Sequence, residues 1–100
     1  MILPLSKTML PSEYVKMGWC QHQSARTEDG RSTAPGAYDA SRVCLLGAIS
    51  RAFYLRTITP TQMCGLIKAG DARWNDASGR TQAEVVAELA RRERAIGLRR

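Results

Sequence analysis

The stretch from Val43 to Phe53 places the strongest constraint on how this chain can fold. Apolar side chains fill most of it and leave little polar surface on any face of a helix. A helix of that kind needs other elements around it, so it belongs at the centre of a bundle. Asp39 or Ser41 can cap it, and we expect it over about residues 40–55. The internal Gly47 costs roughly 1 kcal/mol against alanine, which predicts close approach of another backbone.

Two further helices begin with capping boxes. Thr59-Pro60-Thr61-Gln62 supplies a cap, a proline at the first helical position and a glutamine three residues after the cap. It predicts a helix over about residues 60–69. Thr81-Gln82-Ala83-Glu84 repeats the pattern and predicts a helix over about residues 82–96.

The N-terminal half contains weaker signals. Pro11 begins a short helix expected over about residues 12–17. Further on, Asp29-Gly30 favours a tight turn. Residues 21–26 and 31–33 can pair around this turn as a small hairpin, or the segment forms an irregular loop.

These elements predict a mainly α fold, a compact bundle of about four helices with a small hairpin or an irregular loop attached. The chain has 100 residues, which suits one domain. Its 44% hydrophobic and 24% charged residues argue against wholesale disorder. We expect a flexible N-terminal arm at residues 1–11, a single helical domain at residues 12–97 and a basic tail at residues 98–100.

The cysteines indicate an intracellular protein. Cys20, Cys44 and Cys64 are odd in number, and the sequence shows no CxxC pair, secretory signal or membrane-spanning apolar run. We therefore expect reduced thiols in the cytoplasm. With His22 the three cysteines offer zinc-ligand chemistry, but their spacing matches no common zinc motif. We expect no bound metal and no cofactor.

Cys20 and His22 also have the chemistry of a nucleophile and its base. On a strand, their spacing of two places both side chains on one face. No glycine-rich elbow surrounds the cysteine, and nothing in the sequence identifies an oxyanion site. Paired carboxylates, a phosphate loop, a dinucleotide fingerprint and a helix-turn-helix are also missing from the pattern. The sequence therefore predicts no catalytic residue and favours a protein that is not an enzyme.

The densest polar segment, residues 71–81, is expected to be a loop between two helices. Loops on a rigid scaffold often carry binding groups. Trp74 can stack on an aromatic ring of a ligand, Asn75 can form hydrogen bonds with an amide edge of a ligand, and Arg80 can bind an anionic group. The alternative is structural: Trp74 belongs to the core, while Asn75 and Asp76 bond to their own backbone as turn residues.

The basic C-terminus offers a second candidate surface. The net charge is +6, and the last ten residues contain five arginines against one acid, Glu93. Such an end can meet phosphates, an acidic partner or a membrane surface, or it forms a solvated helix face. Glu88 lies one turn before Arg92, where the two can pair. The residues that would bind nucleic acid are Arg91, Arg92, Arg94, Arg99 and Arg100.

Three motifs occur in order along the chain: GWCQ at residues 18–21, CLLGA at 44–48, and WND at 74–76 followed by Gly79-Arg80-Thr81. They resemble a family of small uncharacterised proteins of actinobacteria and their phages, over about residues 12–96. The resemblance implies one intact domain and such a source, and it implies no activity. The positions that it offers for a shared ligand- or partner-binding site are Trp19, Trp74, Asn75, Asp76 and Arg80.

We therefore predict a small non-enzymatic binding protein of unknown target, a phage or mobile-element accessory factor that acts on a host component. The alternative is a nucleic-acid-binding accessory protein that uses the basic C-terminal helix, and the third hypothesis is a small enzyme that uses the loop from Trp74 to Arg80. The expected partner is a host or phage protein, with nucleic acid as the alternative and no membrane. The protein is expected to be a monomer or a homodimer.

Overall fold

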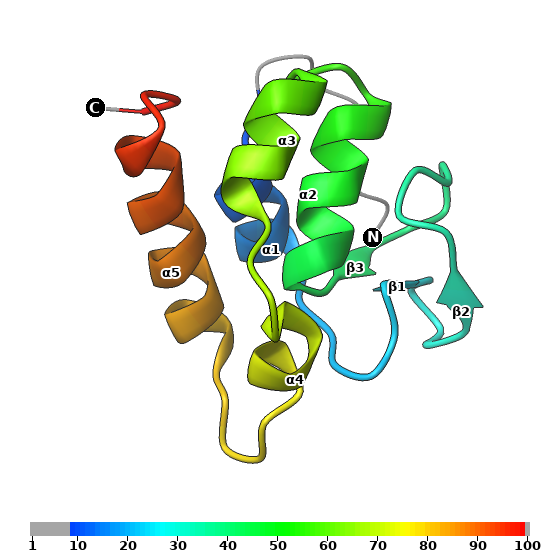
Figure 1. The fold of residues 1–100 in the computed structure, drawn as a ribbon. Coiled ribbons are helices and arrows are strands. Elements are labelled where there is room, and N and C mark those ends of the chain that lie inside the picture. The colour runs from blue at the N-terminus through cyan, green and yellow to red at the C-terminus, as the bar shows by residue number, and fades with distance from the viewer. Residues whose placement is uncertain (1–8, 100) are drawn as a thin grey trace.

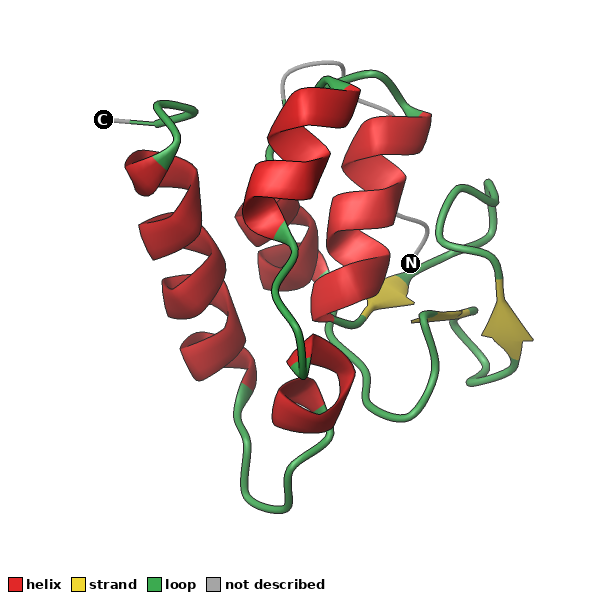
Figure 2. Ribbon diagram, viewed as in Figure 1, coloured by secondary structure: helices red, strands yellow, loops and turns green. Residues whose placement is uncertain are grey.

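The computed structural model describes residues 9–99, which form a mainly α domain (Figures 1 and 2). The helices are α1 (Pro11–Met17), α2 (Leu45–Tyr54), α3 (Pro60–Leu66), α4 (Asp71–Asn75) and α5 (Gln82–Ala95). The strands are β1 (Ala25–Arg26), β2 (Ser32–Thr33) and β3 (Arg42–Val43). The predicted mainly α class is thus confirmed, as a compact globule of these helices with a small sheet. Most of the expected arm (residues 1–8) and Arg100 lie outside the described residues.

The hairpin is present rather than an irregular loop, with strands of two residues each. β1 and β2 pair in antiparallel register around Gly30, whose φ is 91°. β3, which the sequence did not predict, pairs with the other edge of β1, so that the sheet order is β2-β1-β3. A parallel bridge between Trp19 and Val43 extends the sheet beyond β3.

The central helix begins later than predicted, and this prediction was wrong. Neither Asp39 nor Ser41 caps α2, because the residues that follow them pair with β1 as β3. The helix starts at Leu45, and its cap is Cys44, whose Sγ accepts a hydrogen bond from the N–H of Gly47 at 3.2 Å. Strand pairing, which no local pattern shows, therefore fixes the start of α2.

Both capping boxes form as predicted, at Thr59 and at Thr81. The helix predicted over residues 60–69 ends earlier, at Leu66, and the predicted polar loop opens with the short helix α4. Gly70 lies between the two helices with a φ of 85°. Because glycine adopts a positive φ readily, the chain turns there and starts a new helix.

The core lies between α1, α2, α5 and the sheet, and Figure 1 shows α2 beside α3 with α5 along the other side. Arg51 of α2 is among the charged residues that the fold buries, with 0% exposure. Its guanidinium donates to the carbonyl oxygens of Pro35 and Ala37, at 2.6 and 3.0 Å, and lies over the ring of Tyr14. Arg51 therefore holds the loop between β2 and β3 against α2.

Gly47 allows a close contact between two backbones, as the sequence predicts. A Cβ atom at Gly47 would collide with the carbonyl oxygen of Ser24. Gly47→Ala should therefore lower the free energy of unfolding by about 1–3 kcal/mol, because the clash outweighs the better helix propensity of alanine. In the matched control Gly65→Ala, the new Cβ would meet only Ile96 at 3.4 Å, and stability should rise by up to about 1 kcal/mol. Urea denaturation compares the two, and equal stability would contradict the packing at Gly47.

Candidate functional site

Asn75, at the end of α4, joins three segments of the chain. Its side chain is buried, with 1% of the residue exposed. The Oδ1 atom accepts hydrogen bonds from Nε1 of Trp19 at 2.8 Å and from the N–H of Leu45 at 3.0 Å. The Nδ2 atom donates to the carbonyl oxygen of Cys20 at 3.2 Å and to Oδ1 of Asp76 at 3.0 Å. Both donor and both acceptor positions of the Asn75 side-chain amide are therefore occupied by hydrogen bonds within the protein.

A second set of bonds joins the same two motifs on the outer side. Nε2 of Gln21 donates to the carbonyl oxygens of Asn75 and Ala77 at 3.0 and 3.1 Å. The N–H of His22, a residue with a φ of 68°, donates to Oδ1 of Asp76 at 2.8 Å. Burial acts to raise the pKa of Asp76, but the hydrogen bonds from His22 and Asn75 outweigh it and lower that pKa. The structure thus brings Trp19, Asn75 and Asp76 together.

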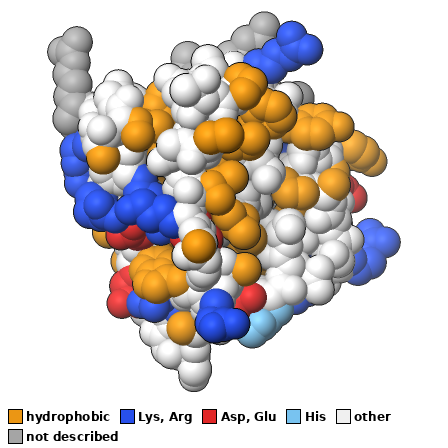
Figure 3. Space-filling model, viewed as in Figure 1, with side chains coloured by type: hydrophobic (Ala, Val, Ile, Leu, Met, Phe, Trp, Pro, Cys, Tyr) orange, Lys and Arg blue, Asp and Glu red, His pale blue; other side chains and the backbone are white. Residues whose placement is uncertain are grey.

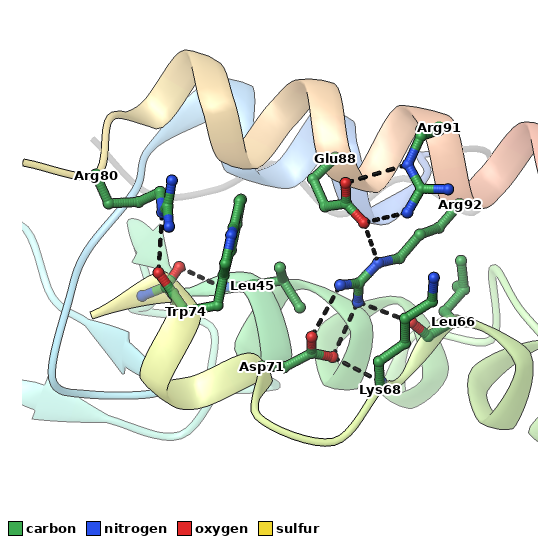
Figure 4. A network of polar contacts seen from close by, with 10 residues as sticks. Leu45, Leu66, Lys68, Asp71, Trp74, Arg80, Glu88, Arg91 and Arg92 are labelled. Carbon is green, nitrogen blue, oxygen red and sulfur yellow. Dashed lines mark hydrogen bonds and ion pairs between the residues drawn. The ribbon is translucent and has the colours of Figure 1, made fainter. Parts of the chain in front are cut away.

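Trp74 and Arg80 form a separate pair between α4 and α5 (Figure 4). The guanidinium of Arg80 lies over the indole of Trp74, 3.9 Å from the ring centroid, and its Nε donates to the carbonyl oxygen of Trp74 at 2.9 Å (Figure 4). Trp74 is half-buried and packs against the core. A cation over the ring is a favourable contact, and it covers the surface on which a ligand ring would stack.

The thiols of Cys20 and Cys44 are buried, and burial disfavours their thiolate forms. Burial, followed by the neighbouring Cys44, raises the pKa of Cys20 to about 11, and burial also raises the pKa of Cys44. The ring of His22 is exposed and faces Asp76, with Nδ1 3.7 Å from Oδ2. Because a thiol reacts as its thiolate, this arrangement does not supply an activated nucleophile.

The four residues with zinc-ligand chemistry are divided between the interior and the surface. Cys20 and Cys44 are buried, whereas Cys64 on α3 is exposed. Within residues 9–99, no three His, Cys, Asp or Glu side chains gather in a way that can hold a metal ion.

Arg92, one of the proposed nucleic-acid-binding residues, is buried. Its guanidinium holds both carboxylate oxygens of Asp71 at 2.9 Å, the carbonyl oxygen of Leu66 at 3.0 Å and Glu88 at 2.7 Å (Figure 4). The predicted pairing of Glu88 with Arg92 is thus confirmed. The bonds of Arg92 join α5 to the end of α3 and the start of α4.

Other arginines at the basic C-terminus also contact carboxylates. Arg91 donates through Nε to Glu88 at 3.1 Å, and its hydrogen bonds are the largest of the effects that lower the pKa of Glu88 to about 2. Arg99 reaches the buried Glu93 at 3.3 Å. Arg94 is exposed, with no ion pair within residues 9–99, and Arg100 lies outside them.

A surface that the sequence did not single out lies where α2 leads into α3. A cavity of about 560 Å³ opens there. Phe53, at the end of the stretch expected at the centre of the bundle, is 37% exposed, and Tyr54 is 73% exposed. No sequence motif marks this surface. The positive φ of Arg56, at a position where helices commonly have glycine, appears only in the structure. We call this the end surface, and it consists of Phe53, Tyr54, Arg56, Ile58 and Pro60.

The molecule is therefore a small helical domain in which two tryptophan-containing motifs, GWCQ and WND, are hydrogen-bonded to each other. Residues 15–95 match the model of a family described as a family of unknown function (DUF6197), and the chain belongs to that family. No curated protein and no solved structure matches the chain. No helix within residues 9–99 is long and apolar enough to cross a membrane.

Proposed function

We propose that the protein is a non-enzymatic binding module whose end surface takes a segment of a partner protein. The segment presents one apolar side chain to the cavity and a carboxylate to Arg56. The exposed aromatic residues of the end surface are the observation on which the proposal depends. On the resemblance to proteins of actinobacteria and their phages, we expect the partner to be a component of a bacterial host.

The chemistry of the end surface supports an apolar and acidic segment. Phe53, Tyr54 and Pro60 supply exposed apolar area, with the buried Ile58 in the lining of the cavity. Figure 3 shows hydrophobic side chains gathered over α2 and α3. Arg56 is exposed, and the cavity has no acidic residue in its lining. Tyrosine and arginine are the types that most often dominate binding energy in protein interfaces. The net charge of +6 favours encounter with an acidic partner.

The backbone of Arg56 supports the same location. Its φ is 62°, and its N–H donates to the carbonyl oxygen of Phe53 at 3.1 Å in a helix-ending turn. Glycine is the usual residue at that position, because a left-handed conformation costs other residues about 1–2 kcal/mol. An arginine kept there at the expense of stability is typical of a functional position.

The substitution Arg56→Gly separates binding from stability. It should raise the free energy of unfolding by roughly 0.5–1 kcal/mol, because relief of strain exceeds the added freedom of the unfolded chain. A random peptide library displayed to the wild-type protein should enrich sequences with an apolar residue beside Asp or Glu. Arg56→Gly should bind these peptides about tenfold more weakly, a loss of about 1.4 kcal/mol.

Arg94→Ala is the matched control, since it removes one exposed positive charge away from the end surface. It should leave peptide binding unchanged. If no sequence is enriched, or if Arg56→Gly binds as well as the wild type, the end surface is not the binding site. Because Arg56→Gly is expected to be the more stable protein, loss of binding cannot be attributed to unfolding.

A nucleic acid is the second candidate partner. Lys68, Arg73 and Arg94 are exposed and have no ion pair within the described part of the chain. We place this candidate second because Arg91 and Arg92 already contact carboxylates, with which phosphates would have to compete. It predicts binding to single-stranded DNA or RNA that weakens steeply with salt, and absence of binding at low salt would exclude it.

A further inference from the structure

Cys20 and Cys44 are neighbours across two parallel extended segments. The N–H of Val43 donates to the carbonyl oxygen of Gly18 at 3.0 Å, and the N–H of Cys20 donates to the carbonyl oxygen of Val43 at 3.2 Å. This pattern places Trp19 opposite Val43. Cys20 and Cys44 follow directly on the bridged residues, on either side of the bond from Cys20 to Val43. The pairing ends there, because the Asn75 amide bonds to the carbonyl oxygen of Cys20 and to the N–H of Leu45.

The two thiols also share a face. Side chains alternate along an extended segment, so if Trp19 and Val43 point to one face, Cys20 and Cys44 point to the other. Cys44 keeps an extended backbone, with φ −83° and ψ −179°. Both cysteines are almost fully buried, at 6% and 8% exposure. Paired extended segments lie about 4.8 Å apart, and disulfides join Cα atoms about 4.4–6.8 Å apart.

We propose that Cys20 and Cys44 are a redox modification site, at which a peroxide converts the two free thiols into an intramolecular disulfide. This inference goes beyond the proposed binding function and does not depend on it. A cavity of about 240 Å³, lined by Cys44 with His22 and Asp76, provides the access for so small an oxidant.

The chemistry balances with one peroxide molecule. The sulfur of Cys44, as its thiolate, attacks one peroxide oxygen; the O–O bond breaks, and the second oxygen leaves as hydroxide, which takes up the thiol proton to become water. The sulfur of Cys20 then attacks the sulfenic sulfur of Cys44; the S–O bond breaks, and the first peroxide oxygen, now the sulfenic hydroxyl, leaves as water with the proton of Cys20. Two thiols and one hydrogen peroxide give a disulfide and two waters.

Oxidation of this pair should be slow and should strengthen the fold. Burial raises the pKa of both thiols, so that little thiolate is present at neutral pH. The disulfide would tie the GWCQ motif to the cap of α2 and restrict the unfolded chain. The exposed Cys64 reacts independently and serves as a reference for the progress of oxidation.

The test uses the full chain with Cys64→Ser, oxidised with hydrogen peroxide while folded, then alkylated, digested and examined by mass spectrometry. We expect one reducible cross-linked pair of peptides that contains Cys20 and Cys44, and a urea midpoint above that of the reduced protein. In Cys20→Ser with Cys64→Ser, both effects should be lost, and Cys44 should appear as an oxygen adduct.

Two results would overturn the proposal. In the first, Cys20 and Cys44 are recovered as alkylated thiols even after the folded wild-type protein has been exposed to peroxide for many times the period that fully oxidises Cys64. In the second, the cross-link forms only when the chain is unfolded in urea before peroxide is added. Either result would mean that the folded protein does not hold the two sulfurs within bonding reach.

Discussion

Replacing Asn75 with alanine is expected to lower the free energy of unfolding by about 3–5 kcal/mol. The substitution leaves Nε1 of Trp19, the N–H of Leu45 and the carbonyl oxygen of Cys20 without their present partner. Each buried polar group that loses its hydrogen-bond partner lowers the free energy of unfolding by about 1–3 kcal/mol. Water that enters the space left by the side chain can bond to some of these groups and so reduces the total loss. Urea denaturation followed by tryptophan fluorescence measures the effect.

Ser78→Ala is the matched control for Asn75→Ala. Ser78 lies in the same region, is exposed, and makes no side-chain hydrogen bond within residues 9–99. Its substitution should change stability by less than about 0.5 kcal/mol. A loss below about 1 kcal/mol in Asn75→Ala would show that the amide does not hold the two motifs together, and it would reopen Asn75 as a ligand-binding residue.

Removing the charge of Arg92 should have an effect of similar size. Arg92→Met keeps much of the side-chain volume but leaves the carboxylate of Asp71, which is 4% exposed, without its cation. Breaking one side of a buried ion pair costs about 3–5 kcal/mol. Arg94 is an exposed residue of the same helix, and Arg94→Met should lower the free energy of unfolding by less than about 1 kcal/mol. Thermal or urea unfolding of the two variants makes the comparison.

A double variant tests whether the loss comes from the orphaned charge. In the wild type, the carboxylate of Asp71 accepts a hydrogen bond from the N–H of Lys68 at 2.8 Å. The substitution Asp71→Asn keeps an oxygen that can accept this bond and removes the negative charge. Combined with Arg92→Met, it should recover at least about half of the lost stability. If the double variant is as unstable as the sum of the two single variants, the contribution of Arg92 comes from its other contacts, to Leu66 and Glu88.

Local signals predicted the elements that local physics controls. The caps at Thr59 and Thr81 bond to backbone three residues away, so the sequence shows both partners together. The hairpin turn could be predicted for the same reason, because the Asp29-Gly30 pair that favours it lies within the turn itself. The close approach at Gly47 could also be predicted, because a glycine inside a helix needs a reason.

The errors arose where distant residues decide the structure. The start of α2 depends on the pairing of β3 with β1, and the buried state of Arg92 depends on Asp71, 21 residues away. From the charge pattern alone, Arg92 was predicted to be an exposed cation that could bind nucleic acid. Arg51 was missed for the same reason, since its carbonyl partners at Pro35 and Ala37 lie in another loop.

The candidate site shows the same limit. The motifs correctly drew attention to Trp19, Asn75 and Asp76, which the structure brings together. They could not show that Trp19 and Asn75 bond to each other across 56 residues of sequence. The end surface was not predicted because no motif marks it, and the exposure of Phe53 and Tyr54 is a property of the folded chain.

An amide NMR titration of the isotope-labelled protein with a peptide enriched in the selection tests the central claim most directly. The proposed function predicts that the shifted resonances concentrate at residues 53–62, around the end surface, while those of residues 19–22 and 74–80 stay in place. Shifts concentrated at residues 19–22 and 74–80 would contradict the proposal, and would show that the hydrogen-bonded motifs form the binding site.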